Sequence, residues 1–219
     1  MRSRGGRPCK PSRSPRPSGT KEWRHMTGDR VRSVIRLVLA VFMAAISALL
    51  IAQVQKGALE PENDNEARLN RLQPTDKVMD AIGLKPGMVA AEIGAGRGRY
   101  VMHLADRVGR NGKVFAEDID AESLEYLKRR CGRWGIDNVE TVLGDVMDPK
   151  LPRGKLDLIF VISSYHHFAD PVKLLRNARP SLKPTGILAI GEWLPNPADK
   201  EDSEFSTPEE MTAQMKAAG

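Results

Sequence analysis

Cysteine is scarce in this chain of 219 residues, and aromatic residues make up only 5% of it. The two cysteines, Cys9 and Cys131, form no Cys-x-x-Cys pair. A disulfide framework or a cysteine-ligated zinc site needs more cysteines at closer spacing, so we predict neither, and no metal site. Cys131 falls in a predicted helix and is expected to be a small buried or half-buried residue.

A net positive charge is confined to the first 36 residues, although the formal net charge of the whole chain is +6. Residues 1–36 hold eleven Lys and Arg against two acidic residues, so residues 37–219 carry a net charge of −3. A nucleic-acid-binding domain needs its basic patch on the folded domain itself. The sequence therefore predicts no nucleic-acid partner.

One long apolar run lies near the N-terminus. It spans residues 37–52 (LVLAVFMAAISALLIA), sixteen residues without a charge, and follows a basic tail over residues 1–33 that is expected to be disordered. A signal-peptide core is usually ~7–15 residues long and ends at a small-x-small cleavage site. A membrane-spanning helix needs ~17–20 apolar residues.

The segment 34–55 is therefore predicted to be a transmembrane anchor or a signal segment, and a buried helix of the domain is the minor alternative. The arginine-rich flank is expected to stay cytoplasmic. This places the domain on the non-cytoplasmic side, either anchored by a single N-terminal span or exported. Residues 56–75 are expected to be a polar linker, with a short helical turn over 66–72.

Strands and helices alternate over residues 76–219, which are expected to form one domain. Thr75 is the expected cap of a helix over 76–82. Strands are predicted at 88–93, 113–117, 139–143, 156–162 and 186–192, and further helices at 98–108, 121–134, 171–179 and 208–218. This alternation predicts an α/β fold with a doubly wound, mostly parallel, Rossmann-like sheet.

A glycine-rich loop, Glu92-Ile93-Gly94-Ala95-Gly96-Arg97-Gly98, follows the first predicted strand. Glycines let the backbone turn sharply, and the helix that follows offers free amides to a ligand. A dinucleotide fingerprint requires Gly-x-Gly-x-x-Gly, but Arg99 stands where its third glycine would fall. The spacing therefore disfavours a nicotinamide cofactor, and a simple strand-to-helix turn is the alternative.

Two acidic residues end the next two strands. Asp118, with Glu117 as its neighbour, can accept hydrogen bonds from both hydroxyls of a ribose. Its alternative role is a helix cap, for which Asp120 is better placed. Asp145, after Gly144, can accept from an exocyclic amine such as that of adenine, and a plain turn residue is the alternative.

Together these features resemble the class I S-adenosylmethionine-dependent methyltransferase superfamily. The methyltransferase type 11 branch, which includes ubiquinone and menaquinone biosynthesis enzymes, is similar over Leu156-Asp157-Leu158, Tyr165-His166-His167-Phe168, Leu174-Leu175 and Leu182-Lys183-Pro184-Thr185-Gly186. Thr185 replaces a glycine of that branch. The resemblance extends from about Gln73 to Trp193 and does not identify a substrate.

The resemblance implies S-adenosylmethionine as the cofactor and methyl transfer to an unidentified small-molecule acceptor. Glu92 and the loop residues Gly94, Ala95, Gly96 and Gly98 would hold the methionine end of the cofactor. Asp118, with Ile119 beside it, would bind the ribose. Asp145 and Val146 would face the adenine, and Ile162 and Ser163 would border the methyl-transfer site.

Tyr165, His166 and His167 are the candidate catalytic residues. They stand after the fourth strand, where a general base is needed if the acceptor must lose a proton. The alternative is that Tyr165 and Phe168 are packing residues and that one histidine caps a helix or bonds to the backbone.

The superfamily sheet has seven strands, and Gly219 falls where the sixth should begin. The resemblance thus implies a domain without its last hairpin and with an exposed sheet edge. A non-catalytic S-adenosylmethionine-binding module or a membrane-tethered scaffold is the alternative function, and a nicotinamide-dependent oxidoreductase is a weaker one. The oligomeric state is not indicated.

Overall fold

The computed structural model describes residues 22–193 and 205–219, and the chain divides into two units, Met1–Ala52 and Gln53–Gly219. The helix α1 (Glu22–Ala58) crosses this boundary. Its stretch Arg30–Leu50, with a mean hydropathy of 2.4 and no buried residues, is long and apolar enough to cross a bilayer, a test that a signal sequence also passes.

Residues 22–33 are helical, although they were predicted to belong to a disordered tail. Once the apolar segment has nucleated a helix, each further residue adds a hydrogen bond at little cost, so the helix extends beyond the apolar residues. The rest of that predicted tail, residues 1–21, lies outside the described residues.

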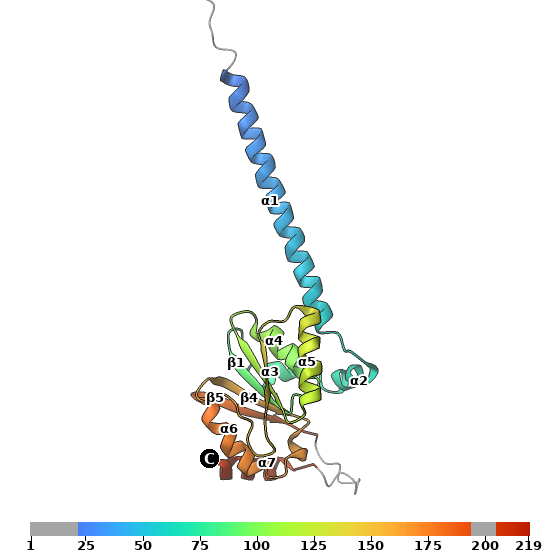
Figure 1. The fold of residues 1–219 in the computed structure, drawn as a ribbon, viewed down its shortest axis with the longest axis vertical. Helices are drawn as coiled ribbons and strands as arrows, with labels where there is room; N and C mark the ends of the chain where they lie inside the picture. The colour runs from blue at the N-terminus through green and yellow to red at the C-terminus, as the bar shows by residue number, and fades with distance from the viewer. Residues whose placement is uncertain (1–21, 194–204) are drawn as a thin grey trace, which may run out of the picture. The chain divides into compact units, whose positions relative to one another are not determined.

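The second unit is built on a five-stranded parallel sheet in the order β3-β2-β1-β4-β5 (Figure 1). The strands are β1 (Val89–Ile93), β2 (Lys113–Asp118), β3 (Val139–Leu143), β4 (Leu156–Ile162) and β5 (Leu182–Gly191). The predicted doubly wound fold is therefore confirmed. Among the described residues, β3 and β5 form the two edges of the sheet.

Helices cover both faces of the sheet (Figure 1). One face packs against α3 (Thr75–Ala81), α4 (Arg99–Val108) and α5 (Ala121–Trp134). The other packs against α6 (Pro171–Ala178) and α7 (Pro208–Ala218). The remaining short elements are α2 (Asp64–Leu72) and the 3-10 turns η1 (Tyr165–His167) and η2 (Arg179–Ser181).

Several element boundaries differ from the predictions, and for three of the starts the structure gives the reason. Pro74, not Thr75, is the N-cap of α3 and makes no side-chain cap bond, so Thr75 is already helical. The helix α2 begins at Asp64, because the Asn63 side chain accepts from the Glu66 amide. Strand β5 begins at Leu182, since an edge strand with a register shift tolerates Pro184.

The strand order creates a crevice at the carboxyl ends of β1 and β4. The chain winds from β1 to β2 in one direction and from β4 to β5 in the other, and ligands of open α/β sheets bind at such a switch point. The Ser164 hydroxyl donates to the carbonyl oxygen of Ile93 at 3.1 Å and links the two strand ends. The glycine loop and η1 therefore face each other across this crevice.

Candidate functional site

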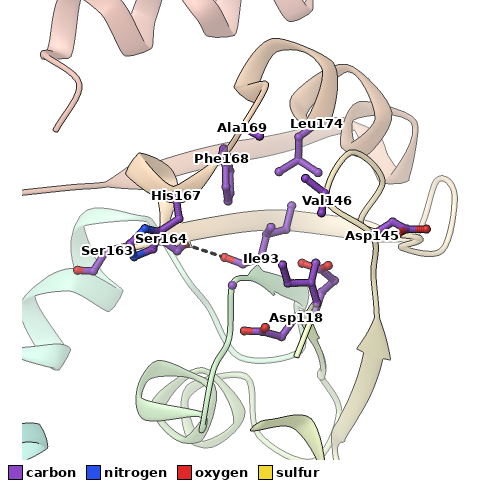
Figure 2. A pocket seen from close by; sticks show the side chains of 13 residues that line it. Ile93, Asp118, Asp145, Val146, Ser163, Ser164, His167, Phe168, Ala169 and Leu174 are labelled. Carbon is purple, nitrogen blue, oxygen red and sulfur yellow. Dashed lines mark hydrogen bonds between the residues drawn. The ribbon is translucent and has the colours of Figure 1, made fainter. Parts of the chain in front are cut away.

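Two cavities open at the strand ends. The main cavity, of about 420 Å³, is lined by Ile93, Gly94, Glu117, Asp118, Ile119, Asp145, Val146, Ser163, Ser164, His167, Phe168, Ala169 and Leu174. In Figure 2, Ile93 and Asp118 lie on one side of it, and Phe168, Leu174 and Val146 point in from the other.

The side cavity, of about 260 Å³, shares Gly94 and Ser163 with the main cavity. It is lined by Asn63, Asn65, Glu66, Leu69, Glu92, Gly94, Ala95, Gly96, Arg97, Arg99, Tyr100, Arg130, Ile162 and Ser163. The structure thus distributes the predicted cofactor residues over two adjoining cavities. Gly98 is the exception, because it lines neither.

The glycine loop requires glycine at two positions for different reasons. Gly94 has a φ of 78°, and a Cβ there would stand 2.6 Å from the Ser164 hydroxyl oxygen. Gly98, with a φ of 87°, is the N-cap of α4, and a Cβ there would collide with the Leu127 side chain. The first glycine keeps the crevice open, and the second lets α4 pack closely against α5.

Asp118 holds the glycine loop in place. One carboxylate oxygen accepts from the Gly96 amide at 2.7 Å, and the other accepts from the Asp120 amide at 2.9 Å. Asp120 in turn caps α5 through the amides of Glu122 and Ser123, as predicted. Each oxygen of Asp118 retains a second lone pair for a ligand hydroxyl on the cavity side.

Glu92 is a buried carboxyl in the wall of the side cavity, with 3% of its surface exposed. Its Oε2 atom has no hydrogen-bond partner among the described residues. Burial raises the pKa of this carboxyl well above its ordinary value, Arg99 lowers it, and Asp118 raises it further. Burying a hydrogen-bond acceptor without a donor costs free energy of folding. The Glu92 carboxyl is therefore suited to a ligand that brings a cationic donor.

Glu117 is a cavity residue that sequence analysis treated only as a neighbour of Asp118. Its side chain is buried and lies so close to Gly144 that a Cβ at that glycine would overlap the carboxyl. Burial, together with Asp118, raises the pKa of Glu117 to about 8. The sequence did hold a signal for this contact: two adjacent acidic residues end β2, and a glycine follows β3.

Asp145 differs from its expected orientation. Its carboxylate pairs with the Lys150 ammonium at 3.0 Å and is 70% exposed, and Figure 2 shows it directed away from the cavity. The chain reverses here through an isolated bridge between Asp145 and Asp148, which turns the side chain outward. Val146 and Ile119, both about half exposed, line the main cavity.

The three candidate catalytic residues occupy different surroundings. The Tyr165 hydroxyl donates to Gln214 of α7 at 2.6 Å, and burial raises its pKa to about 12, so Tyr165 is a packing residue. His167 is exposed and lines the main cavity. His166 is paired through its ring with Glu192, which sequence analysis did not consider.

The segment predicted as a polar linker forms part of the side cavity. Glu66 of α2 is buried and pairs with Arg130 of α5 at 2.8 Å. Asn70 and Gln73 accept from the Arg99 guanidinium at 2.8 and 3.1 Å. Polar side chains thus attach this segment to the glycine loop and to α5.

Comparison with known proteins identifies relatives of this domain. A family model described as a methyltransferase domain matches residues 90–186. Among solved structures, an S-adenosylmethionine-dependent methyltransferase from Aquifex aeolicus is 30% identical with a TM-score of 0.65. The match covers 73% of this chain and 88% of that one.

Two named curated relatives are a nocamycin O-methyltransferase of Saccharothrix syringae and a demethylmenaquinone methyltransferase of Staphylococcus aureus. The first is 30% identical over 57% of this chain and 45% of its own length. The second is 27% identical over 53% of this chain and 47% of its own length. The chain therefore spans about half the length of these relatives.

Proposed function

Because the chain belongs to the S-adenosylmethionine-dependent methyltransferases, we propose that it transfers a methyl group from this cofactor to a small-molecule acceptor. The main support is the unpartnered buried oxygen of Glu92, which adjoins the glycine loop that Asp118 holds. A ligand with an ammonium group at one end and ribose hydroxyls further along satisfies both carboxylates.

We assign the roles of the residues from their places in the two cavities. Glu92 would receive the ammonium group and Asp118 the ribose hydroxyls, while Ile119 and Val146 would contact the adenine. Ile162 and Ser163, where the cavities adjoin, would border the reacting methyl group. When bound, the cofactor supplies an electrophilic methyl group on a sulfonium sulfur. The protein aligns the acceptor and excludes water.

Titration calorimetry of the full chain in detergent tests this function. We expect S-adenosylmethionine to bind and NADH not to bind. Asp118→Ala is expected to weaken binding roughly tenfold, because a hydrogen bond to a charged group contributes ~1.5 kcal/mol or more. Asp137 is exposed, so Asp137→Ala serves as the matched control and should retain the wild-type Kd. Binding of NADH in place of S-adenosylmethionine would overturn the proposal.

We further propose that α1 anchors the domain to a membrane. The support is the exposed apolar stretch Arg30–Leu50, whose N-terminal part carries Arg30, Arg32 and Arg36. The positive-inside rule then predicts a cytoplasmic N-terminus and a domain on the other side. Protease added to intact spheroplasts should digest the domain. Protection of the domain until the membrane is lysed would contradict this orientation.

A further inference from the structure

Glu117 is a buried carboxyl in the wall of the main cavity. It stands next to Asp118 at the end of β2, and only 2% of its surface is exposed. One of its carboxyl oxygens packs against Gly144, which follows the neighbouring strand β3, and a Cβ at that glycine would overlap it. The absence of a side chain at position 144 therefore leaves the room that this carboxyl occupies.

No cation is paired with the Glu117 carboxyl among the described residues. The charged groups that face it are Asp118 on its own strand, and Asp148 and Lys150 on the connection between β3 and β4. The Lys150 ammonium is already paired with Asp145 at 3.0 Å. A buried carboxyl that faces two carboxylates favours its neutral form. Its pKa is accordingly raised to about 8, mainly by burial.

A neutral carboxyl can recognise a ligand that a carboxylate cannot. Its hydroxyl oxygen donates a hydrogen bond, and its carbonyl oxygen accepts one, whereas an ionised carboxylate only accepts. Adenine carries the complementary pair on one edge, because its 6-amino group donates and an adjacent ring nitrogen accepts. The neutral acid can therefore form two parallel hydrogen bonds with adenine. The carboxylate forms one and sets its charge against the lone pair of the ring nitrogen.

The strand order places the base of an adenosyl ligand on the same side of the cavity as Glu117. A ribose held by Asp118 at the end of β2 leaves the base near the ends of β2 and β3, where Val146 points into the cavity (Figure 2). Asp145, the acceptor expected there, is directed outward. His167 follows β4, which β1 separates from β2. Glu117 is thus the acidic side chain left for the base among the described lining residues.

We propose that Glu117, as the neutral acid, recognises the adenine base of the cofactor, donating to a ring nitrogen and accepting from the 6-amino group. This inference rests on the proposed function. It also makes binding depend on pH. A rise in pH through about 8 ionises the free carboxyl and removes the proton that it donates. The affinity then falls with the fraction of protein that is still protonated.

Titration calorimetry with 5′-methylthioadenosine tests the pH dependence on the full chain in detergent. This probe contains the adenosine part of the cofactor and lacks the ammonium group, which would itself titrate. Between pH 7 and pH 9 we expect the wild-type Kd to rise about tenfold. The amide of Glu117→Gln donates and accepts at any pH, so this variant should bind within about threefold of wild type at pH 7 and change less than about twofold by pH 9. A constant wild-type Kd, or an unaltered pH dependence in Glu117→Gln, would overturn the proposal.

An analogue of the probe whose purine lacks the 6-amino group tests the partner of Glu117. Wild type should bind it about tenfold more weakly than 5′-methylthioadenosine, and Glu117→Leu should bind the two alike. Asp145→Asn should keep the wild-type preference. If Asp145→Asn abolished the preference, or if wild type showed none, the assignment to Glu117 would be wrong. Circular dichroism verifies the fold of Glu117→Leu, and Glu117→Gln, which keeps the shape of the side chain, tests the proposal independently of that variant.

Binding of S-adenosylhomocysteine to the wild type at pH 7 separates this inference from the proposed function. Absence of that binding would remove the proposed function. Binding that is accompanied by a pH-independent affinity for 5′-methylthioadenosine would overturn only the role of Glu117.

Discussion

Replacing Glu92 by glutamine is expected to weaken S-adenosylmethionine binding by about 2–5 kcal/mol, roughly thirtyfold or more. The Glu92 carboxyl is buried, its Oε2 has no partner among the described residues, and it adjoins the glycine loop. Glutamine has nearly the same shape but carries no charge to pair with an ammonium group. Calorimetry on both proteins measures the change, and Glu125→Gln, on the exposed face of α5, is the control.

The same replacement is expected to stabilise the protein in the absence of the cofactor. Since burial raises the pKa of Glu92 in the folded state, the folded protein binds more protons than the unfolded chain above the ordinary carboxyl pKa of 4.5. The free energy of unfolding then falls as pH rises above that value. Glu92→Gln removes this loss, so its denaturation midpoint should exceed that of wild type more at pH 8 than at pH 5. An unchanged Kd would show that Glu92 does not hold the cofactor, and an unchanged midpoint would contradict the expected destabilisation by its buried charge.

Replacing Arg130 by alanine is expected to lower the free energy of unfolding by about 3–5 kcal/mol. The guanidinium is 2% exposed, pairs with Glu66 at 2.8 Å, and lies 3.5 Å from a carboxylate oxygen of Glu62. Removing it leaves a buried carboxylate uncompensated. Denaturant unfolding followed by circular dichroism measures the loss.

Arg129 provides the matched control on the same helix, because its side chain is 58% exposed and its nearest carboxylate, in Glu125, is 3.9 Å away. Arg129→Ala should change stability by less than about 0.5 kcal/mol. The double variant Arg130→Met with Glu66→Leu should recover most of the loss, since apolar residues can replace a buried ion pair. If the two arginine variants lowered the free energy of unfolding equally, the stabilising role of the buried Arg130–Glu66 pair would be contradicted.

The Arg130–Glu66 pair is also part of the candidate site, because both residues line the side cavity. Arg130 donates to the Arg97 carbonyl oxygen of the glycine loop at 3.4 Å. The segment around α2 therefore contributes a wall to the cavity that contains Glu92. Weakening of cofactor binding in Arg130→Ala, beyond that in Arg129→Ala, would follow from this arrangement.

Local sequence patterns were sufficient to predict most helices and strands of the domain. The predicted bounds of α5, β3, β4 and α7 agree with the structure, because caps and apolar periodicity act within a few residues. Thr207 forms a complete capping box with Glu210 at the start of α7. The predictions failed where a partner distant in the sequence determines where an element begins. An example is the start of β5, which pairs with β4 across a register shift.

The sequence alone determined the glycine loop, the positions of Glu92 and Asp118, and the exclusion of a dinucleotide loop by Arg99, because these depend on spacing along one strand–turn–helix unit. Only the tertiary structure decided which side chains meet across the sheet. It turned Asp145 outward, buried Glu117 against Gly144, joined Glu66 to Arg130, and brought Glu192 to His166. The last three of these contacts join residues 26 to 64 positions apart, and strand order and helix packing set them, so no local pattern records them.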